Sequence, residues 1–178
     1  MADIIKLNEV SRGDLPERLR VEFYFDFKKY PFRHQDLFTR PDVISVISAL
    51  DAIHPYACEW IKKAIDEKKK TSALKEMGPE HFKGRCIGEF IIYVEDGAVF
   101  EPGFIRGSLK NNKHTLFVGK QTVLAGTNIF LDEGDIYIGE QNSVEPGAGI
   151  KGPTIIGNKN DIRQGAYFRG DVIIGDGG

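Results

Sequence analysis

The sequence predicts a mainly-β protein whose second half is a parallel β-helix, a solenoid of short stacked strands. Glycines repeat at intervals of eighteen residues, as Gly139, Gly157 and Gly175 do. Large apolar residues repeat at a shorter interval of six residues, so that three repeats make up eighteen. A period of six fits neither an α-helix nor a hairpin meander. It is typical of hexapeptide-repeat β-helices, in which three short strands close one coil. The large apolar residues that recur every six positions are Ile138, Val144, Ile150, Ile156, Ile162, Phe168 and Ile174.

The six-residue period predicts which side chains form the core. Every sixth side chain should point to the axis, where equivalent residues of successive coils stack on one another. Ile156 is therefore expected to be fully buried between Ile138 and Ile174. The dipeptides Pro146-Gly147 and Gly152-Pro153 are turn signals at the corners of the coils. An accidental spacing in an ordinary β-sandwich is the alternative interpretation.

The strings VEPGAGIKGPTIIG and IRQGAYFRGDVIIG carry a family resemblance. They are similar to the hexapeptide-repeat acyltransferases, and most of all to the C-terminal domain of the bifunctional N-acetylglucosamine-1-phosphate uridyltransferase/glucosamine-1-phosphate acetyltransferases. The resemblance covers about half the chain. It implies a left-handed parallel β-helix, a homotrimer, and an acyl-CoA-dependent acetyltransferase that uses acetyl-CoA to modify an amino-sugar phosphate in nucleotide-sugar synthesis.

The resemblance also implies where the phosphate of the sugar would bind. Residues 166–170 (AYFRG) are similar to a family string whose arginine holds that phosphate, so Arg169 is the main candidate. A guanidinium suits this role because it can donate two parallel hydrogen bonds to phosphate oxygens. Arg163, one hexad earlier, and Lys151, one coil below, are predicted to widen the basic strip. Solvated cations at the corners of the coils are the alternative.

The sequence assigns no catalytic residue. In the family the catalytic histidine and the acetyl-CoA groove lie some coils further on, whereas this sequence stops at Gly178 in mid-coil. We therefore expect a truncated β-helix that binds phosphorylated sugar weakly and turns over nothing. Two other functions stay open: a non-catalytic β-helical part or partner of a sugar-1-phosphate nucleotidyltransferase (UDP-N-acetylglucosamine pyrophosphorylase-like), and a ligand-free trimerisation scaffold.

Other classes of function are disfavoured. Residues 147–152 (GAGIKG) match GxGxxG, but they meet Pro153 instead of opening a helix, which argues against a dinucleotide site. A net charge of −2 gives no reason to expect nucleic acid or an anionic membrane as a partner. The histidines fall outside the regular hexads, so no metal site is predicted; they are His34, His54, His81 and His114.

The compartment follows from what the sequence lacks. No apolar stretch of eighteen residues is present, which argues against a membrane-spanning segment. Cys58 and Cys86 form no metal-binding or disulfide pattern, which favours a reducing compartment. The cytoplasm is the predicted location.

Residues 1–87 are predicted to form a small α/β region, and residues 88–178 the β-helix. Alternating apolar side chains in residues 21–28 predict a half-buried strand, with an aromatic loop as the alternative. Thr39 is expected to cap a helix that ends at Pro55, where a second helix begins.

The second helix should carry one apolar stripe, and the lysines at residues 68–70 should be its solvated end. Residues 72–77 are expected to form a helical turn. The stripe consists of Ala57, Trp60, Ile61, Ala64 and Ile65.

The first coils of the β-helix should be less regular. Residues 93–103 (YVEDGAVFEPG) repeat as residues 137–147 (YIGEQNSVEPG), and residues 108–115 break the period as a polar loop. Between them a six-residue step runs through Val118, Leu124, Phe130 and Ile136 before the frame slips by two residues.

Overall fold

A computed structural model describes residue 6, residues 9–110 and residues 112–178. Contacts divide the chain into two compact units, residues 1–56 and 57–178. The first unit contains short helical segments and the start of the long helix α2 (Val46–Thr71), which continues into the second unit. The short segments are η2 (Arg12–Asp14), η3 (Glu17–Leu19), α1 (Val21–Tyr24) and η4 (Gln35–Thr39).

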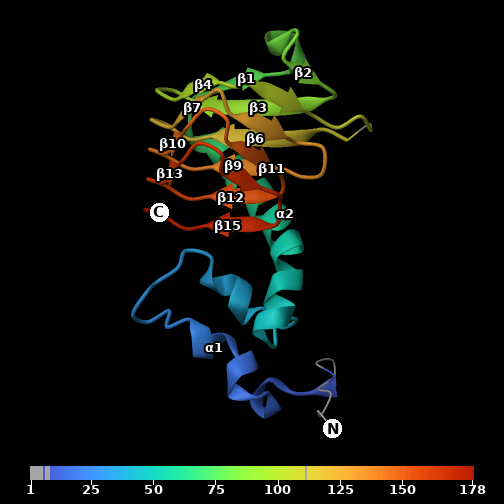
Figure 1. The fold of residues 1–178 in the computed structure, drawn as a ribbon, viewed down its shortest axis with the longest axis vertical. Helices are drawn as coiled ribbons and strands as arrows, with labels where there is room; N and C mark the ends of the chain where they lie inside the picture. The colour runs from blue at the N-terminus through green and yellow to red at the C-terminus, as the bar shows by residue number, and fades with distance from the viewer. Residues whose placement is uncertain (1–5, 7–8, 111) are drawn as a thin grey trace. The chain divides into compact units, whose positions relative to one another are not determined.

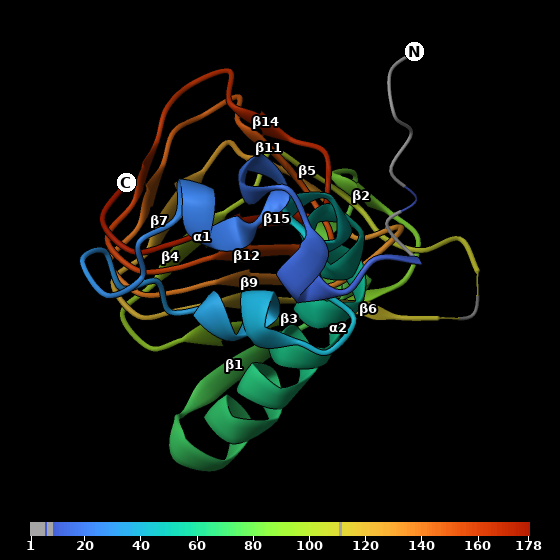
Figure 2. The same cartoon turned by 90° about the horizontal axis from the view of Figure 1, so that it is seen from below.

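The second unit is a parallel β-solenoid of about four turns, which confirms the mainly-β prediction (Figure 1). Each turn adds one strand to each of three sheets, so the sheets form three faces around one core (Figure 2). We name them the helix-covered face, the arginine face and the valine face. The chain passes from the arginine face to the helix-covered face and then to the valine face in every turn.

The helix-covered face has six strands, of which the first runs antiparallel to its neighbour. They are β1 (Leu74–Met77), β3 (Phe90–Glu95), β6 (His114–Val118), β9 (Ile136–Ile138), β12 (Thr154–Ile156) and β15 (Val172–Ile174). The short helix η5 (Pro79–Phe82) follows β1.

The other two faces contain only parallel strands. The arginine face consists of β2 (Cys86–Ile87), β5 (Phe104–Arg106), β8 (Asn128–Phe130), β11 (Gly149–Lys151) and β14 (Tyr167–Phe168). The valine face consists of β4 (Val99–Glu101), β7 (Val123–Ala125), β10 (Ser143–Val144) and β13 (Asp161–Ile162).

The predicted core is confirmed. Ile138 and Ile156 have no exposed surface, and the ladder register places Ile156 between Ile138 and Ile174. Within the six-residue series only Phe168 and Ile174, on the last coil, are partly exposed, and both pack against the core.

The predicted phase is wrong at Phe130. The core side chains of this coil are Ile129 and Leu131, whereas Phe130 points outward from the arginine face. The reason is the corner between β7 and β8. Ile129 follows Leu124 by five residues, whereas their register partners in the next coil, Ile150 and Val144, are six residues apart.

A buried polar ladder fills the corner between the helix-covered face and the valine face. Asn142 donates from its side chain to the carbonyl oxygen of Gly157 at 2.9 Å, and its own side-chain oxygen accepts from the backbone N–H of Asn160 at 2.8 Å. Thr122 stands below Asn142 and accepts from its backbone N–H. Because buried polar groups need partners, these contacts fix the corner in each successive coil.

Residues 57–71 of α2 lie along the helix-covered face (Figure 2). Trp60 contacts the ring of Tyr137 edge-on at 5.1 Å, and Tyr137 in turn stacks on Phe117 at 4.8 Å. Ile61 and Ile65 are buried, so the predicted apolar stripe is confirmed. The helix therefore covers the outward aromatic side chains of this face.

Lys68 is not the solvated helix end that the lysine run suggested. Its ammonium group contacts Glu95 at 2.8 Å and Glu140 at 3.1 Å and lies over the ring of Phe117. Burial by itself lowers the pKa of Lys68, but the hydrogen bonds to the two carboxylates outweigh it and leave the pKa raised.

Predictions for two segments of the N-terminal region are wrong. Residues 21–28 contain α1 and a turn instead of a strand, because the described part of residues 1–56 has no strand with which they could pair. The aromatic-loop alternative fits better. Residues 72–77 include β1 and not a helical turn, because Leu74–Met77 pairs with β3.

Pro55 neither ends nor starts a helix. It lies inside α2, and Thr39 belongs to η4 instead of capping α2. Proline in a helix interior costs about 3 kcal/mol. The ring of Pro55 is exposed, while Ala52, Tyr56 and Ala57 are buried, so the apolar stripe continues past it. Burial of that stripe offsets the cost. No helix in the described part of the chain is long and apolar enough to cross a bilayer.

Candidate functional site

Two of the three predicted phosphate-binding residues share one column of the arginine face. Ile150 of β11 pairs in register with Phe168 of β14. The residues that follow, Lys151 and Arg169, therefore occupy equivalent positions in successive coils. Both side chains point away from the core, because Ile150 and Phe168 pack into it.

Two glycines shape the surface around this column. Gly149 lies in register with Tyr167, and a Cβ at Gly149 would stand 2.4 Å from the Tyr167 ring. The missing side chain thus makes room for a ring that is 56% exposed. Gly170, directly after Arg169, has a φ of +92°, and a Cβ there would meet the carbonyl oxygen of Gly152 at 2.9 Å. The backbone that carries Arg169 is therefore held close against the coil below.

The two cations of the column differ in whether a carboxylate neutralises them. Lys151 pairs with Glu133 at 2.6 Å, and its side chain is 18% exposed. Arg169 is exposed and makes no ion pair or hydrogen bond with any residue that the structure describes. A guanidinium without a carboxylate partner can bind an external anion without first breaking an ion pair. Arg169 is therefore the side chain of this face best placed to bind phosphate.

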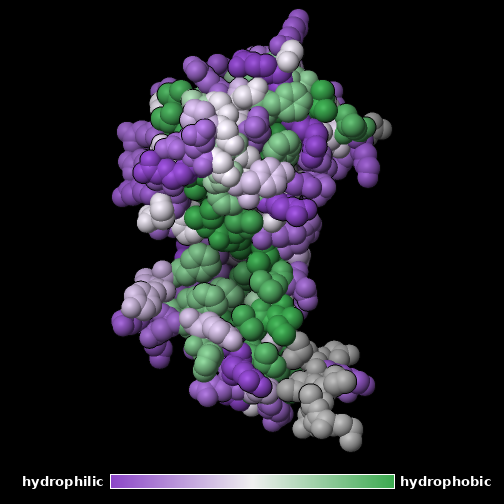
Figure 3. All heavy atoms as spheres, viewed as in Figure 1, coloured by the Kyte–Doolittle hydropathy of each residue, from purple (hydrophilic) through white to green (hydrophobic). Residues whose placement is uncertain are grey.

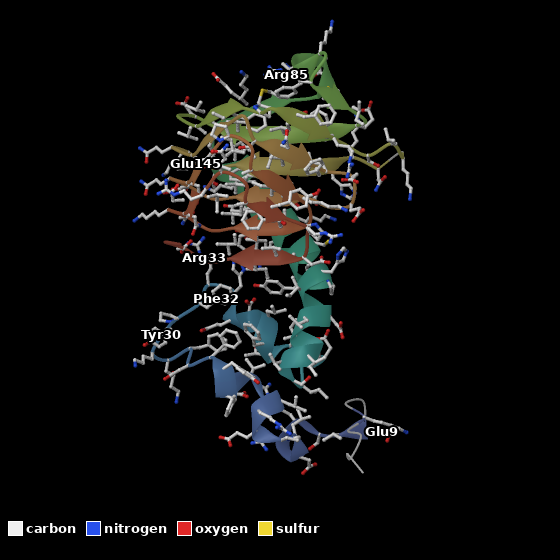
Figure 4. All side chains as sticks on the ribbon, viewed as in Figure 1. Glu9, Tyr30, Phe32, Arg33, Arg85 and Glu145 are labelled. Atoms are coloured by element: carbon white, nitrogen blue, oxygen red, sulfur yellow. The ribbon has the colours of Figure 1, made fainter. Side chains whose placement is uncertain are left out.

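The third predicted residue, Arg163, does not belong to this column. It follows β13, in the corner between the valine face and the arginine face. Two carboxylates neutralise it, Asp161 at 2.6 Å and Glu145 at 2.9 Å (Glu145 is labelled in Figure 4). The hydrogen bond to Glu145, followed by the charge of Asp161, raises the pKa of Arg163. Arg163 is therefore already paired with carboxylates of its own chain.

The sequence analysis missed an arginine and an aromatic ring on the same face. Arg106 pairs in register with Phe130, and Phe130 with Lys151, so the column continues downward. The Arg106 guanidinium lies 4.9 Å from the Phe130 ring and pairs with Asp132 at 2.9 Å. Arg106 Nε and Asp132 Oδ1 are buried and have no partner among the described residues. The face therefore combines cations, exposed rings and unused hydrogen-bonding atoms.

A histidine lies at the corner next to this face. Nδ1 of His114 is 3.6 Å from Oδ1 of Asp135, and Nε2 of His114 is 3.1 Å from the amide nitrogen of Asn112. Asp135 is fixed by the backbone N–H of Thr115 at 2.6 Å. If the Asn112 amide donates to Nε2, the ring proton is on Nδ1 and faces the carboxylate. In that tautomer the lone pair of Nε2 already accepts the hydrogen bond of Asn112.

Cys58 of α2 completes the polar groups near this corner. Burial raises the pKa of its thiol, and the charges of Asp135 and Asp171 raise it further. Because the thiolate is the nucleophilic form of cysteine, these surroundings favour an unreactive thiol. No group of three or more His, Cys, Asp and Glu side chains in the described residues is placed to hold a metal ion.

The fold and the face together define a β-solenoid protein with a cationic and aromatic outer surface. Comparisons with protein-family models, with curated proteins and with solved structures found no match. The eighteen-residue coil could have revealed part of this surface, because it relates Gly149 to Tyr167 and Lys151 to Arg169. It could not have revealed Arg106 and Phe130, since the earlier coils are longer.

Proposed function

We propose that the chain supplies the acceptor-binding face of an acyl-CoA-dependent acetyltransferase that acts on an amino-sugar phosphate in nucleotide-sugar synthesis in the cytoplasm. The solenoid would be left-handed, as in the hexapeptide-repeat class. The observation that carries the proposal is Arg169, which lies above Lys151 and beside the exposed ring of Tyr167. The phosphate would contact the two cations, and the apolar side of the sugar would lie on the tyrosine.

The charges predict weak binding by one chain. A single oriented arginine contributes roughly 1.5–3 kcal/mol through charge-assisted hydrogen bonds. Lys151 adds less, because Glu133 already neutralises it. A millimolar dissociation constant corresponds to about 4.1 kcal/mol, so we expect the affinity of one chain to be at most millimolar once the cost of association is included.

His114 is the base that we propose for the same site. The carboxylate of Asp135 lies 3.6 Å from Nδ1 of its ring, and a general base must come within hydrogen-bond reach of the acceptor amine. The amine would have to displace the Asn112 amide from Nε2. Asp135, which lies beside His114, and Glu133, which pairs with Lys151, belong to the same corner between β8 and β9.

Acetyl-CoA is proposed from the family resemblance alone. Its long arm needs a groove, and four cavities of the described residues are lined by residues outside the arginine face. One is lined by residues 73–75 and 94–98, and another by residues 76–80, 89–91 and 113. Two more lie within residues 24–39. The residues of the arginine face thus fit the acceptor and do not by themselves fit the donor.

The test is an NMR titration that measures binding of glucosamine 1-phosphate. Unphosphorylated glucosamine is the ligand control. We expect Arg169→Ala to weaken binding about tenfold or more, equivalent to about 1.4 kcal/mol. Arg163→Ala is the matched control, because it removes an arginine that two carboxylates already neutralise. Equal losses in both variants, or no preference for the phosphorylated sugar, would contradict the proposal.

A second candidate function, a trimerisation scaffold or a non-catalytic partner of a sugar-1-phosphate nucleotidyltransferase, rests on the valine face. Val99 and Val123 stack in register there and are 44% and 42% exposed. The column continues with Ser143 and Asp161, so the two valines form a small apolar patch that could pack against another subunit. Sedimentation should then give about three times the 19.9 kDa chain mass. Val123→Glu should yield monomers, and Leu109→Glu, on an exposed loop residue, should not; a wild-type monomer would remove this candidate.

A further inference from the structure

The first unit carries an aromatic pocket that the proposed function does not use. It encloses about 340 Å³ and lies within residues 24–38. Three of its rings are largely exposed: Tyr24 at 56%, Phe25 at 44% and Tyr30 at 66%. Figure 3 shows apolar side chains gathered on the visible surface of this unit. Tyr30 and Phe32 project from the loop between α1 and η4 (Figure 4).

The floor of the pocket is a preformed stack of rings. Phe25 and Phe27 lie parallel with their centres 5.6 Å apart, and Phe38 of η4 stacks on both at 5.3 and 5.1 Å. The hydroxyl of Tyr24 donates to the carbonyl oxygen of Arg18 at 2.9 Å, which anchors one wall. The rings are thus held by one another, and a ligand would find them already arranged.

Two lysines lie in the chain between the lining residues Phe27 and Tyr30. Lys28 and Lys29 are exposed, and the Lys29 ammonium lies 5.1 Å from the centre of the Tyr30 ring. The one carboxylate of the lining, Asp26, accepts hydrogen bonds from the backbone N–H groups of Lys28 and Lys29, both at 3.1 Å. Asp26 therefore builds the turn that carries the two exposed lysines, and their ammonium groups can pair with an anionic group of a ligand.

These features select one kind of ligand. The volume is at the small end of the range for ligand pockets, roughly 300–1,000 Å³, so it suits a few residues of a peptide better than a large folded surface. Grooves lined with aromatic rings bind proline-rich segments, because the polyproline II helix is preformed and loses little entropy on binding. The two lysines add a preference for acidic residues beside the prolines.

We propose that the pocket formed by Tyr24, Phe25, Phe27, Tyr30, Phe32 and Phe38 binds an extended, proline-rich peptide that carries an acidic residue next to its prolines. The prolines pack on the ring stack and on Tyr30. The acidic residue pairs with Lys28 or Lys29. This inference is independent of the proposed function, because none of these residues belongs to the solenoid.

The test uses a fluorescein-labelled synthetic peptide of prolines and leucines with a glutamate at each end, and a second peptide with a lysine at each end. Anisotropy titration of the full chain should show binding of the glutamate peptide and much weaker binding of the lysine peptide. Tyr30→Ala should weaken binding about tenfold, the loss typical of an aromatic anchor. Leu50→Ala is the matched control: Leu50 is 65% exposed in the same unit and lies outside the pocket.

A charge exchange makes the test specific. The double variant Lys28→Glu, Lys29→Glu should reverse the preference and favour the lysine peptide, an outcome that a misfolded protein could not produce. Binding of neither peptide would overturn the proposal. So would an equal loss in Leu50→Ala, preferential binding of a single-stranded oligothymidine, or self-association of the wild type that Tyr30→Ala abolishes.

Discussion

The solenoid and the first unit contain apolar side chains of the same kinds, but they use them in opposite ways. In the solenoid Ile129, Ile138 and Ile156 have no exposed surface. In the first unit Phe23, Tyr24 and Tyr30 are each more than half exposed. The difference teaches that an apolar pattern predicts burial only where the chain supplies a covering surface. Each coil covers the next, whereas the described residues of the first unit form no strand that could cover residues 21–28.

The largest effect should come from a charge in the solenoid core. Ile156→Asp would place a carboxylate without a partner between Ile138 and Ile174, and we expect it to lower the free energy of unfolding by several kcal/mol. Ile47→Asp is the control, because Ile47 is 46% exposed in α2. Thermal denaturation followed by circular dichroism measures both. Similar melting temperatures for the two variants would show that the six-residue register does not define the core.

The polar ladder should be the next most sensitive part. Asn142→Ala would leave the carbonyl oxygen of Gly157 and the backbone N–H of Asn160 without their partner. Each such buried group costs roughly 1–3 kcal/mol. Asn128→Ala is the matched control, since Asn128 lies on the outward side of the arginine face. Urea denaturation should show a clear loss for the first variant and little change for the second.

The core of the solenoid could be predicted from the sequence because its side chains obey a strict period. The period fails at Phe130, because the core step from Leu124 to Ile129 is five residues instead of six. It is also silent on Asn142, because an asparagine in a turn is normal on the surface, and only the stacked coils show that it is buried. The predictions for residues 21–28 and for Pro55 were wrong for one reason. They rested on local propensity, whereas the structure of each segment depends on what it can pack against.

The candidate site was predictable only where the coils have equal length. The spacing of eighteen residues relates Lys151 to Arg169, and the structure places them in one column. Arg163 was predicted to belong to the same basic strip because it lies one hexad earlier, but consecutive hexads lie on different faces. The carboxylates that neutralise Arg163 come from its own strand and from the coil below, and no spacing rule reveals such partners.

An intermediate effect should come from Glu95, the carboxylate that pairs with Lys68 of α2, because its contribution to stability depends on pH. Burial by itself raises the pKa of Glu95, but hydrogen bonds from Lys68, from Ser72 and from the backbone N–H of Lys120 outweigh it and hold the pKa below its ordinary value of 4.5. A lowered native pKa means that this carboxylate stabilises the fold above its unfolded pKa and ceases to do so as the pH falls through its folded pKa.

Glu95→Gln should therefore lower stability at about pH 7 and make the remaining stability less dependent on pH below about 4.5. Denaturation midpoints measured across the acid range give the comparison. Glu101→Gln is the control, because Glu101 is exposed on the valine face. An unchanged acid profile in Glu95→Gln would show that the contact with Lys68 does not couple to folding.

The smallest effect should come from the first unit, and it sharpens the contrast most directly because one residue type occurs in both environments. Tyr137 is 7% exposed between Trp60 and Phe117, so Tyr137→Ala removes a buried ring and should cost about 3 kcal/mol or more. Tyr30 is 66% exposed, and its contact with Lys29 is at the surface. Surface substitutions of this kind change stability by about 0.5 kcal/mol or less.

Tyr30→Ala should therefore melt within a degree or two of the wild type, while Tyr137→Ala melts far below it. Differential scanning calorimetry can compare the two variants and can separate the transitions of the two units if they unfold independently. A large loss in Tyr30→Ala would mean that the exposed rings stabilise the first unit and are not kept for a ligand. A small loss, together with weaker binding of the glutamate peptide, would separate the use of Tyr30 from the use of Tyr137: one ring binds a partner, and the other holds a helix on a sheet.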